Sequence, residues 1–462
     1  MRRSSGLVLT EPFCGSGLPE AHPVAPADGS GFLSGMVVKL GVYGIVLFAI
    51  DLLGTGPAWW GLVTMGLGAL TAVLGILYAL TERDIKRFLA YSTIENIGII
   101  VTALGAGMTF DSYGQRLLGA FLLLAALYHV ANHGLYKTLL FLEAGVIEHA
   151  TGTRDMDRLG GLVHRLPRTS MISMVGTLGI AALPPLNGFV SEWLIFQGLF
   201  QGFRIPSHLI GILIVVAAAA LGLTGGLAVN AFVRAYGIPF LGMPRTHDAA
   251  TATETGQPVL GPGVLAAGCV ALSVGAPLVL TAFGRAIRTA TSVDLLPQLV
   301  IGNLTVIPAH TDFSAFSPTY LAVSLVLVAI VPLTIYLAGR PTAPARRTTP
   351  VWDGGIVAFK PRMQYSAMTF TAPVRVTFDR LYRPTVTLQR ASDDPAGRSG
   401  PVHYETEVTP LFERFVYRPV TAAVQYLARL ATPIQSGSVN LYLLYVFLVV
   451  LLAYLLGAVG AG

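Results

Sequence analysis

Long apolar runs are the feature of this sequence that most constrains its fold. Each run reaches roughly 20 residues or more, the length of α-helix needed to cross the hydrocarbon core of a bilayer. With 53% hydrophobic and 12% charged residues, the chain resembles a membrane protein far more than a soluble one. The sequence therefore predicts an all-α polytopic protein of the cell's inner (plasma) membrane. We expect about nine crossings, at residues 32–53, 59–80, 88–107, 117–148, 170–202, 208–233, 262–283, 318–338 and 437–460.

The polar segments divide the chain into four expected parts. These are a non-membrane N-terminal segment at 1–31, a transmembrane domain at 32–338, a polar connection at 339–436 and a last membrane helix at 437–462. Short loops rich in arginine and lysine stay on the cytoplasmic side, which places the loops around Arg83 and Arg154 there.

An amphipathic helix is expected inside the polar connection, before the last crossing. Apolar side chains between about Thr406 and Thr432 follow a helical stripe, typical of a helix that lies on the membrane surface or along other helices. Pro419 leaves open a helix that is broken at that point.

Several classes of site are not expected. Cys14 and Cys269 are far apart and form no Cys/His cluster, so the sequence predicts no metal ligand, no iron–sulfur cluster and no bound cofactor. No catalytic residue is expected either, and a redox centre would have to belong to a partner. The net charge of +6 comes from arginines between apolar runs, which indicates membrane topology rather than nucleic-acid binding.

Lysine is scarce, and its positions suggest titration. Only four of the 30 lysine and arginine residues are lysines, and Lys39, Lys86 and Lys137 lie in or beside apolar runs. Arginine keeps its proton in proteins, whereas a buried lysine can release and rebind one. A genome that favours arginine codons is the simpler alternative. Lys360, in the polar connection, has no evident need to lose a proton.

The segment YHVANHGLYKTLLFLEAGVIEH is the densest group of titratable residues in an apolar run. His129, His133 and Lys137 are spaced i, i+4, i+8, which places them on one helical face. Imidazoles and an amine in such a row can pass a proton between them, so we predict a proton relay. Histidines that only hydrogen-bond neighbouring helices remain the alternative.

Two segments are expected to form broken helices. Pro184, Pro185 and Gly188 fall in the middle of the run at 170–202 and precede Glu192, a candidate terminal proton or ion site. A carboxylate at the lipid edge with no such role is the weaker alternative. Glycines also flank Lys39 in SGMVVKLGVYG, where close packing or local unwinding would place its amine in the interior.

Three further residues have less certain roles. Lys86, in the charged turn TERDIKRFLAYSTIENIG, can be a cytoplasmic topology anchor or part of the proton path. Glu95 lies deeper in the following span, and Glu143 lies on the same run as Lys137. Both are secondary candidates for the relay.

These motifs resemble a known family, the antiporter-like subunits of respiratory complex I, related hydrogenases and multisubunit cation/proton antiporters. The resemblance rests on TERDIKRFLAYSTIENIG, the HxxxHxxxK helix and LPPLNGFVSEW. HATGTRDMDRLGGL, WDGGIVAFKPRMQYSAMTF and IQSGSVNLYLLYVFL are most similar to the hydrogenase-4 and formate hydrogenlyase branch. The resemblance to the family covers the chain from about Leu18 to the end.

The resemblance implies a subunit that moves protons, driven by redox chemistry elsewhere. Its partners would be other membrane subunits and a peripheral arm with nickel–iron hydrogenase and iron–sulfur subunits, within the lipid bilayer. Lys39 resembles the lysine of the family's first broken helix and Lys86 the DIKR lysine. Lys137 with its two histidines resembles the central relay, and Glu192 the charged residue of the second broken helix.

Departures from the family leave alternatives open. Members carry about five or six more helices before the lysine helix, including a glutamate that pairs with that lysine, so we expect an N-terminally truncated sequence. Besides the redox-driven proton subunit, a subunit of a sodium/proton antiporter and a structural remnant without conduction are the competing hypotheses.

Overall fold

Two compact units make up the chain, Met1–Asp379 and Arg380–Gly462. A computed structural model gives the structure and describes residues 17–254, 260–295, 297, 300–301, 305–306, 317–339, 360–390, 402–408, 414–415, 418–432 and 437–460.

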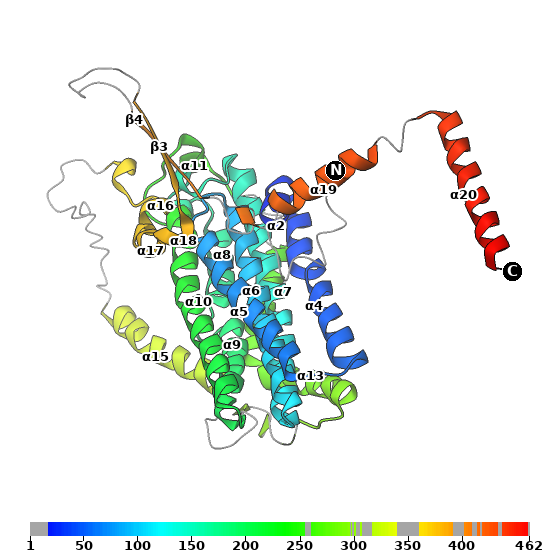
Figure 1. The fold of residues 1–462 in the computed structure, drawn as a ribbon. Helices are drawn as coiled ribbons and strands as arrows, with labels where there is room; N and C mark the ends of the chain where they lie inside the picture. The colour runs from blue at the N-terminus through cyan, green and yellow to red at the C-terminus, as the bar shows by residue number, and fades with distance from the viewer. Residues whose placement is uncertain are drawn as a thin grey trace. The chain divides into compact units, whose positions relative to one another are not determined.

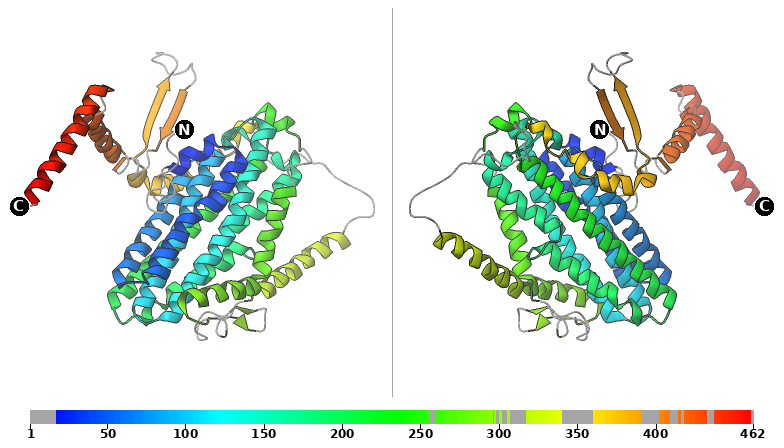
Figure 2. Two further views of the ribbon diagram at one scale, coloured as in Figure 1. Left: turned by 90° about the vertical axis from the view of Figure 1, so that its right-hand side faces the viewer. Right: turned by 90° about the vertical axis from the view of Figure 1, so that its left-hand side faces the viewer.

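The first unit is a bundle of long helices, with several running side by side (Figures 1 and 2). Its N-terminal elements are α2 (Gly17–Val24), α3 (Ala27–Phe32), η1 (Leu33–Val37), α4 (Lys39–Val46), η2 (Leu47–Leu52), α5 (Ala58–Ala79), α6 (Ile85–Ser112), α7 (Arg116–Thr151), η3 (Met156–Arg158) and η4 (Leu162–His164). The later ones are α8 (Pro167–Ile180), α9 (Asn187–Leu199), η5 (Phe200–Arg204), α10 (His208–Phe240), α11 (His247–Thr251), α12 (Leu260–Val274), α13 (Ala276–Thr291), strands β1 (Val300–Ile301) and β2 (Thr305–Val306), α15 (Pro318–Ala338), η6 (Pro361–Met363), α16 (Ala367–Phe370) and α17 (Ala372–Thr377). The short helix α18 (Asp379–Tyr382) begins at the last residue of this unit.

The second unit contains a strand pair and two helices. Strands β3 (Thr385–Arg390) and β4 (Val402–Glu407) pair antiparallel, and α19 (Arg418–Ala431) and α20 (Val439–Gly460) follow. The amphipathic helix α19 comprises Arg418–Ala431 within the stretch expected from about Thr406 to Thr432, and residues 402–407 form β4 instead. Leu411 and Phe412 of the expected stripe lie outside the described residues.

The described residues contain seven helices that are long and apolar enough to cross a membrane. Helices α12 and α13 are apolar enough only as a pair, which is bent by 82° and is either one broken span, for a total of eight, or a re-entrant loop. The span expected at 262–283 corresponds to this bent pair, whose helix is interrupted at Gly275. The span expected at 170–202 is divided between α8 and α9, as its prolines predicted.

Helix α6 lies at the centre of the bundle, beside α5 and α7 (Figure 1). Its apolar stretch is entirely buried. Glycines let the backbones of α5 and α6 approach closely: a Cβ added at Gly75 would lie 2.5 Å from the backbone nitrogen of Glu95. Small residues permit such close contact between membrane helices. This contact fixes the position of the α6 groups that face α7.

Capping residues set the ends of the two helices that carry most candidate residues. The Asp84 carboxylate accepts hydrogen bonds from the backbone nitrogens of Lys86 and Arg87, which starts α6. Helix α7 continues without interruption for 36 residues and ends at Gly152, whose φ of 67° is in the left-handed region. The relay candidates of α7 thus lie on one continuous helix.

Candidate functional site

The predicted row of titratable residues on α7 is fully buried. His129, His133 and Lys137 each have 0% of their surface exposed, and all three lie within the unbroken helix Arg116–Thr151. Their regular spacing on one helical face is therefore confirmed as geometry. The three side chains have different hydrogen-bonding partners.

Lys137 contacts only neutral hydrogen-bond acceptors among the described residues. Its Nζ donates to the Leu89 carbonyl oxygen at 2.7 Å and to Ser92 Oγ at 2.5 Å, both on α6. The ring of Phe232 on α10 lies 6.0 Å away, measured to its centroid. No carboxylate of the described residues lies within ion-pair distance of this amine. The surroundings can therefore accept the amine with or without its extra proton.

His129 bridges α6 and α9. Its Nδ1 lies 2.9 Å from Ser191 Oγ, and its Nε2 lies 3.2 Å from Asn96 Oδ1. Ser191 can also donate its hydroxyl proton to the Gly188 carbonyl at 3.0 Å. Because both ring nitrogens can then donate to an oxygen, the site can hold the imidazole in either tautomer or as the imidazolium.

His133, one turn further along α7, has a different environment. Neither of its ring nitrogens has a hydrogen-bonding partner among the described residues. The ring of Tyr136 meets it edge to face, with centroids 5.6 Å apart, and the Tyr136 hydroxyl donates to Asn96 Oδ1 at 2.8 Å. Buried polar atoms of this kind are costly unless water or a proton transfer partner satisfies them.

The break between α8 and α9 is fixed to α7 by a pair of amides. Asn132 Nδ2 donates to the Asn187 carbonyl at 3.0 Å, and Asn187 Nδ2 donates to Asn132 Oδ1 at 3.1 Å. Glu192 follows on α9, and its Oε2 lies 3.9 Å from the position that a Cβ would take at Gly225. The expected placement of Glu192 just after a helix break is confirmed.

Lys39 lies directly after a distorted turn. The π-helical segment η1 precedes α4, whose first residue is Lys39, and the Lys39 amine donates to the Ser34 carbonyl of that segment. Ser34 Oγ in turn lies 2.7 Å from Thr93 Oγ1 on α6. The expected local unwinding is therefore present, and the side chain is only partly buried.

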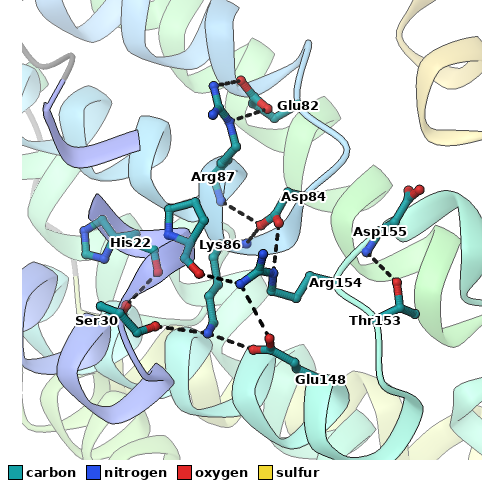
Figure 3. A network of polar contacts seen from close by, with 12 residues as sticks. His22, Ser30, Glu82, Asp84, Lys86, Arg87, Glu148, Thr153, Arg154 and Asp155 are labelled. Carbon is teal, nitrogen blue, oxygen red and sulfur yellow. Dashed lines mark hydrogen bonds and ion pairs between the residues drawn. The ribbon is translucent and has the colours of Figure 1, made fainter. Parts of the chain in front are cut away.

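Lys86 lies in an ion-pair cluster where α6 begins and α7 ends (Figure 3). Only 3% of its surface is exposed, and its Nζ lies 2.7 Å from Glu148 Oε2 and 3.3 Å from the Ala25 carbonyl oxygen. Arg154 extends the cluster, 3.5 Å from Glu148 Oε1 and 2.9 Å from Asp84 Oδ2. The cluster connects three segments that are distant in the sequence.

The two secondary candidates, Glu95 and Glu143, are buried on neighbouring helices, with 1% and 2% of their surface exposed. Asn96 Nδ2 lies 3.5 Å from Glu95 Oε2, and Glu95 interacts electrostatically with Lys137. Ser173 Oγ donates to Glu143 Oε2 at 3.1 Å. Each carboxyl group is thus within the bundle rather than at its surface.

Sequence reasoning missed His22, which the fold brings near enough to Lys137 and Lys86 to interact electrostatically with both. It is fully buried, stacked on Phe141 with centroids 4.6 Å apart, and without a hydrogen bond to its ring among the described residues. Burial, with smaller contributions from Lys137 and Lys86, lowers the pKa of His22 to about 3. Its position in LPEAHPVAP, at the start of the matched motifs, was the available signal.

No metal centre emerges from the described part of the chain, where no group of three His, Cys, Asp or Glu side chains is arranged to hold an ion.

Comparison with known proteins identifies the family. Residues 16–222 match the family of NADH:quinone oxidoreductase/Mrp antiporter transmembrane proteins. Hydrogenase-4 component B of Escherichia coli (strain K12) is 39% identical over 449 residues, 95% of this chain and 65% of that protein. The chain belongs to this antiporter-like family. It is accordingly a multi-pass membrane protein.

Two further proteins resemble the chain, one in sequence and one in fold. Formate hydrogenlyase subunit 3 of Escherichia coli (strain K12) is 37% identical over 362 residues, 78% of this chain and 56% of that protein. The chain thus spans between about half and two thirds of the length of these two relatives. A solved structure of the membrane-bound sulfane sulfur reductase, an archaeal respiratory membrane complex, shares the fold at 23% identity and a TM-score of 0.67, covering 95% of this chain and 64% of that one.

Proposed function

We propose that this antiporter-like chain is a proton-translocating membrane-arm subunit of a hydrogenase-4 or formate hydrogenlyase type complex. The observation that carries the proposal is the environment of Lys137, a fully buried amine held by two neutral oxygens. Removing a charged group from water is costly, so an amine without a counter-ion can lose its proton at modest free-energy cost. The names of the two relatives supply the type of complex.

The proposed relay uses residues of α4, α7 and α9. Lys137 and His133 lie on α7, and His129 reaches across to α9, the helix that carries Glu192. Lys39 lies at the other helix distortion, next to Ser34, which contacts α6. Protons would pass along this line as the charges of the lysines and of Glu192 alternate. For Lys86, the ion pair with Glu148 supports the role of an anchor rather than a relay.

In this proposal the chain acts with partners. Redox chemistry would occur in a peripheral arm with nickel–iron hydrogenase and iron–sulfur subunits, while other membrane subunits would complete the path. A sodium/proton antiporter subunit is the competing function, and it would require sodium for proton movement.

The test is substitution of Lys137 in the assembled complex. Inverted membrane vesicles that contain the Lys137→Ala complex should oxidise donor but translocate less than about a tenth of the wild-type number of protons per electron. Lys360→Ala is the matched control, because Lys360 is exposed and lies outside the bundle motifs. A wild-type proton-to-electron ratio in assembled Lys137→Ala complex would refute the relay. Proton movement that depends on added sodium would favour the antiporter.

A further inference from the structure

A small cavity lies between α6, α7, α8 and α10, with a volume of about 30 Å³. Its wall is mainly aliphatic and aromatic, and its polar members are Glu143, Ser173, Thr177 and Tyr236. About 10–15 Å³ is enough to hold one water molecule when polar partners are present. The cavity therefore has both the size and the polar groups to hold water beside the Glu143 carboxyl group.

Glu143 is an unpaired carboxyl group in this wall. Only 2% of its surface is exposed, Ser173 Oγ donates to it at 3.1 Å, and no lysine or arginine of the described residues forms an ion pair with it. An ionised carboxylate is costly to bury without a cation, so the position favours a group that holds a proton.

Hydroxyl groups continue from Glu143 toward the arginine-rich end of the bundle. Ser170 and Ser173 lie three residues apart on one face of α8, and Ser170 Oγ is 2.9 Å from the Tyr236 hydroxyl. At the start of α8, Glu254 accepts hydrogen bonds from the backbone nitrogen and the hydroxyl of Thr169, at 2.7 and 2.8 Å. Glu254 is only partly buried, so this line extends from solvent to the cavity.

On its inner side the cavity reaches the surroundings of Lys137. Leu89 and Phe232 both line the cavity. The Lys137 amine donates to the Leu89 carbonyl at 2.7 Å and lies 6.0 Å from the Phe232 ring centroid. Leu89 and Phe232 therefore belong both to the cavity wall and to the surroundings of the amine.

We propose that Glu143 and this cavity form a proton-uptake branch that supplies Lys137 from the arginine-rich, expected cytoplasmic end of the bundle. The inference rests on the proposed function. The neutral Lys137 amine takes a proton from the Glu143 carboxylic acid through water in the cavity and becomes an ammonium. The resulting carboxylate regains a proton from solvent through the hydroxyl groups of Ser173, Ser170 and Tyr236. Leu89 and Phe232 must move apart for each transfer.

Few other charged groups surround Glu143, so a change in its protonation can be distinguished from that of its neighbours. Tyr236 is the second titratable side chain of the cavity wall, and Glu254 acts on Glu143 electrostatically. Helix α6 contributes only apolar side chains to the wall. On α10, Arg234 stacks on Phe88 and donates to the carbonyl oxygens of Leu80 and Ala79, at 2.8 and 3.0 Å.

The test measures proton translocation by the assembled complex in inverted vesicles, whose outer solution corresponds to the cytoplasmic side. Glu143→Gln should slow translocation about tenfold, or about 1.4 kcal/mol, and the deficit should grow as the outer pH rises and proton supply falls. Infrared difference spectra of the wild type should contain a protonated carboxyl band that Glu143→Gln removes. Thr151→Val, a buried change near the end of α7 that does not line the cavity, should keep the wild-type rate and band.

Ser173→Ala is a second variant, which retains the Glu143 carboxyl group but removes the hydroxyl that donates to it. It tests the branch if the Glu143→Gln complex does not assemble. It should show the same pH-dependent slowing, smaller in size. A wild-type rate at every outer pH in either assembled variant would overturn the branch, even if Lys137→Ala abolishes translocation. If Lys137→Ala translocates normally, the proposed function fails separately. The proton-uptake branch is then tested by the infrared spectra alone. A protonated carboxyl band of wild-type intensity in Glu143→Gln would overturn the branch.

Discussion

Lys86 and Lys137 are both buried, with 3% and 0% of their surface exposed, yet their amines meet different partners. The Lys86 amine lies 2.7 Å from the Glu148 carboxylate, whereas the Lys137 amine meets the Leu89 carbonyl and the Ser92 hydroxyl. A neighbouring carboxylate stabilises the ammonium form, while neutral oxygens hold either form. Burial alone therefore does not distinguish a titrating lysine from a structural one. The partner atoms do.

Arginine substitution should separate the two lysines most strongly. Arginine keeps its charge, so Lys137→Arg should reduce redox-driven translocation at least about tenfold, close to the effect of alanine. Lys86→Arg preserves an ion pair with Glu148 and should translocate at close to the wild-type rate. The measurement is acidification of inverted vesicles per electron transferred. Equal losses in both variants would contradict the distinction.

Removal of the Lys86 counter-ion should act on stability. Glu148→Gln leaves a buried ammonium without its carboxylate, and we expect a loss of about 1–3 kcal/mol in the free energy of unfolding, below the 3–5 kcal/mol typical of fully buried pairs. The smaller value follows because the Glu148 side chain is 36% exposed. Thermal unfolding of the detergent-solubilised complex measures the loss. An unchanged unfolding temperature would show that the pair contributes nothing.

Burial of His22 should make the stability of the fold depend on pH. Its pKa is lowered from 6.5 to about 3 because the ring is buried. Between these two pH values the imidazole is mostly protonated in the unfolded chain and mostly neutral in the folded chain. The contribution of His22 to the free energy of unfolding should be fully present above about pH 6.5. It should fall as the pH drops toward 3, with a loss of about 2 kcal/mol at pH 5. His22→Gln should flatten this dependence in thermal unfolding. His208→Gln, at an exposed histidine, should leave it as in the wild type.

The smallest effect is expected at the solvent-exposed edge of the same cluster. Arg87 Nη1 lies 3.2 Å from Glu20 Oε1, but the Glu20 side chain is 75% exposed. Exposed ion pairs contribute little, so Glu20→Gln should change the free energy of unfolding by less than about 0.5 kcal/mol. A loss as large as that of Glu148→Gln would mean that the network, rather than burial, determines the cost.

Local patterns predicted the parts of the site that belong to one helix. The spacing of His129, His133 and Lys137 placed them on one face of α7, and the prolines at 184 and 185 predicted the division between α8 and α9. Both signals are properties of neighbouring residues.

Contacts between distant segments could not be predicted in the same way. Glu148 is the last residue of the apolar run predicted at 117–148, and its pairing with Lys86 depends on how the ends of α6 and α7 meet. His22 is 115 residues before Lys137, and only tertiary packing brings the two together. The bend at Gly275 was not predicted, although Pro277 lies two residues after it within the apolar run.

The unbroken α7 has a mechanical consequence. At 1.5 Å per residue its 36 residues span about 54 Å, and Glu148 lies about 16 Å along the axis from Lys137. A rigid rod of this kind keeps the two lysine environments at constant separation, so any axial displacement at one is transmitted undiminished to the other. In the proposed transport cycle, deformation is left to the non-helical residues 181–186 between α8 and α9 and to the π-helical turn before Lys39. Helix α7 would then move as one piece while these two segments change shape.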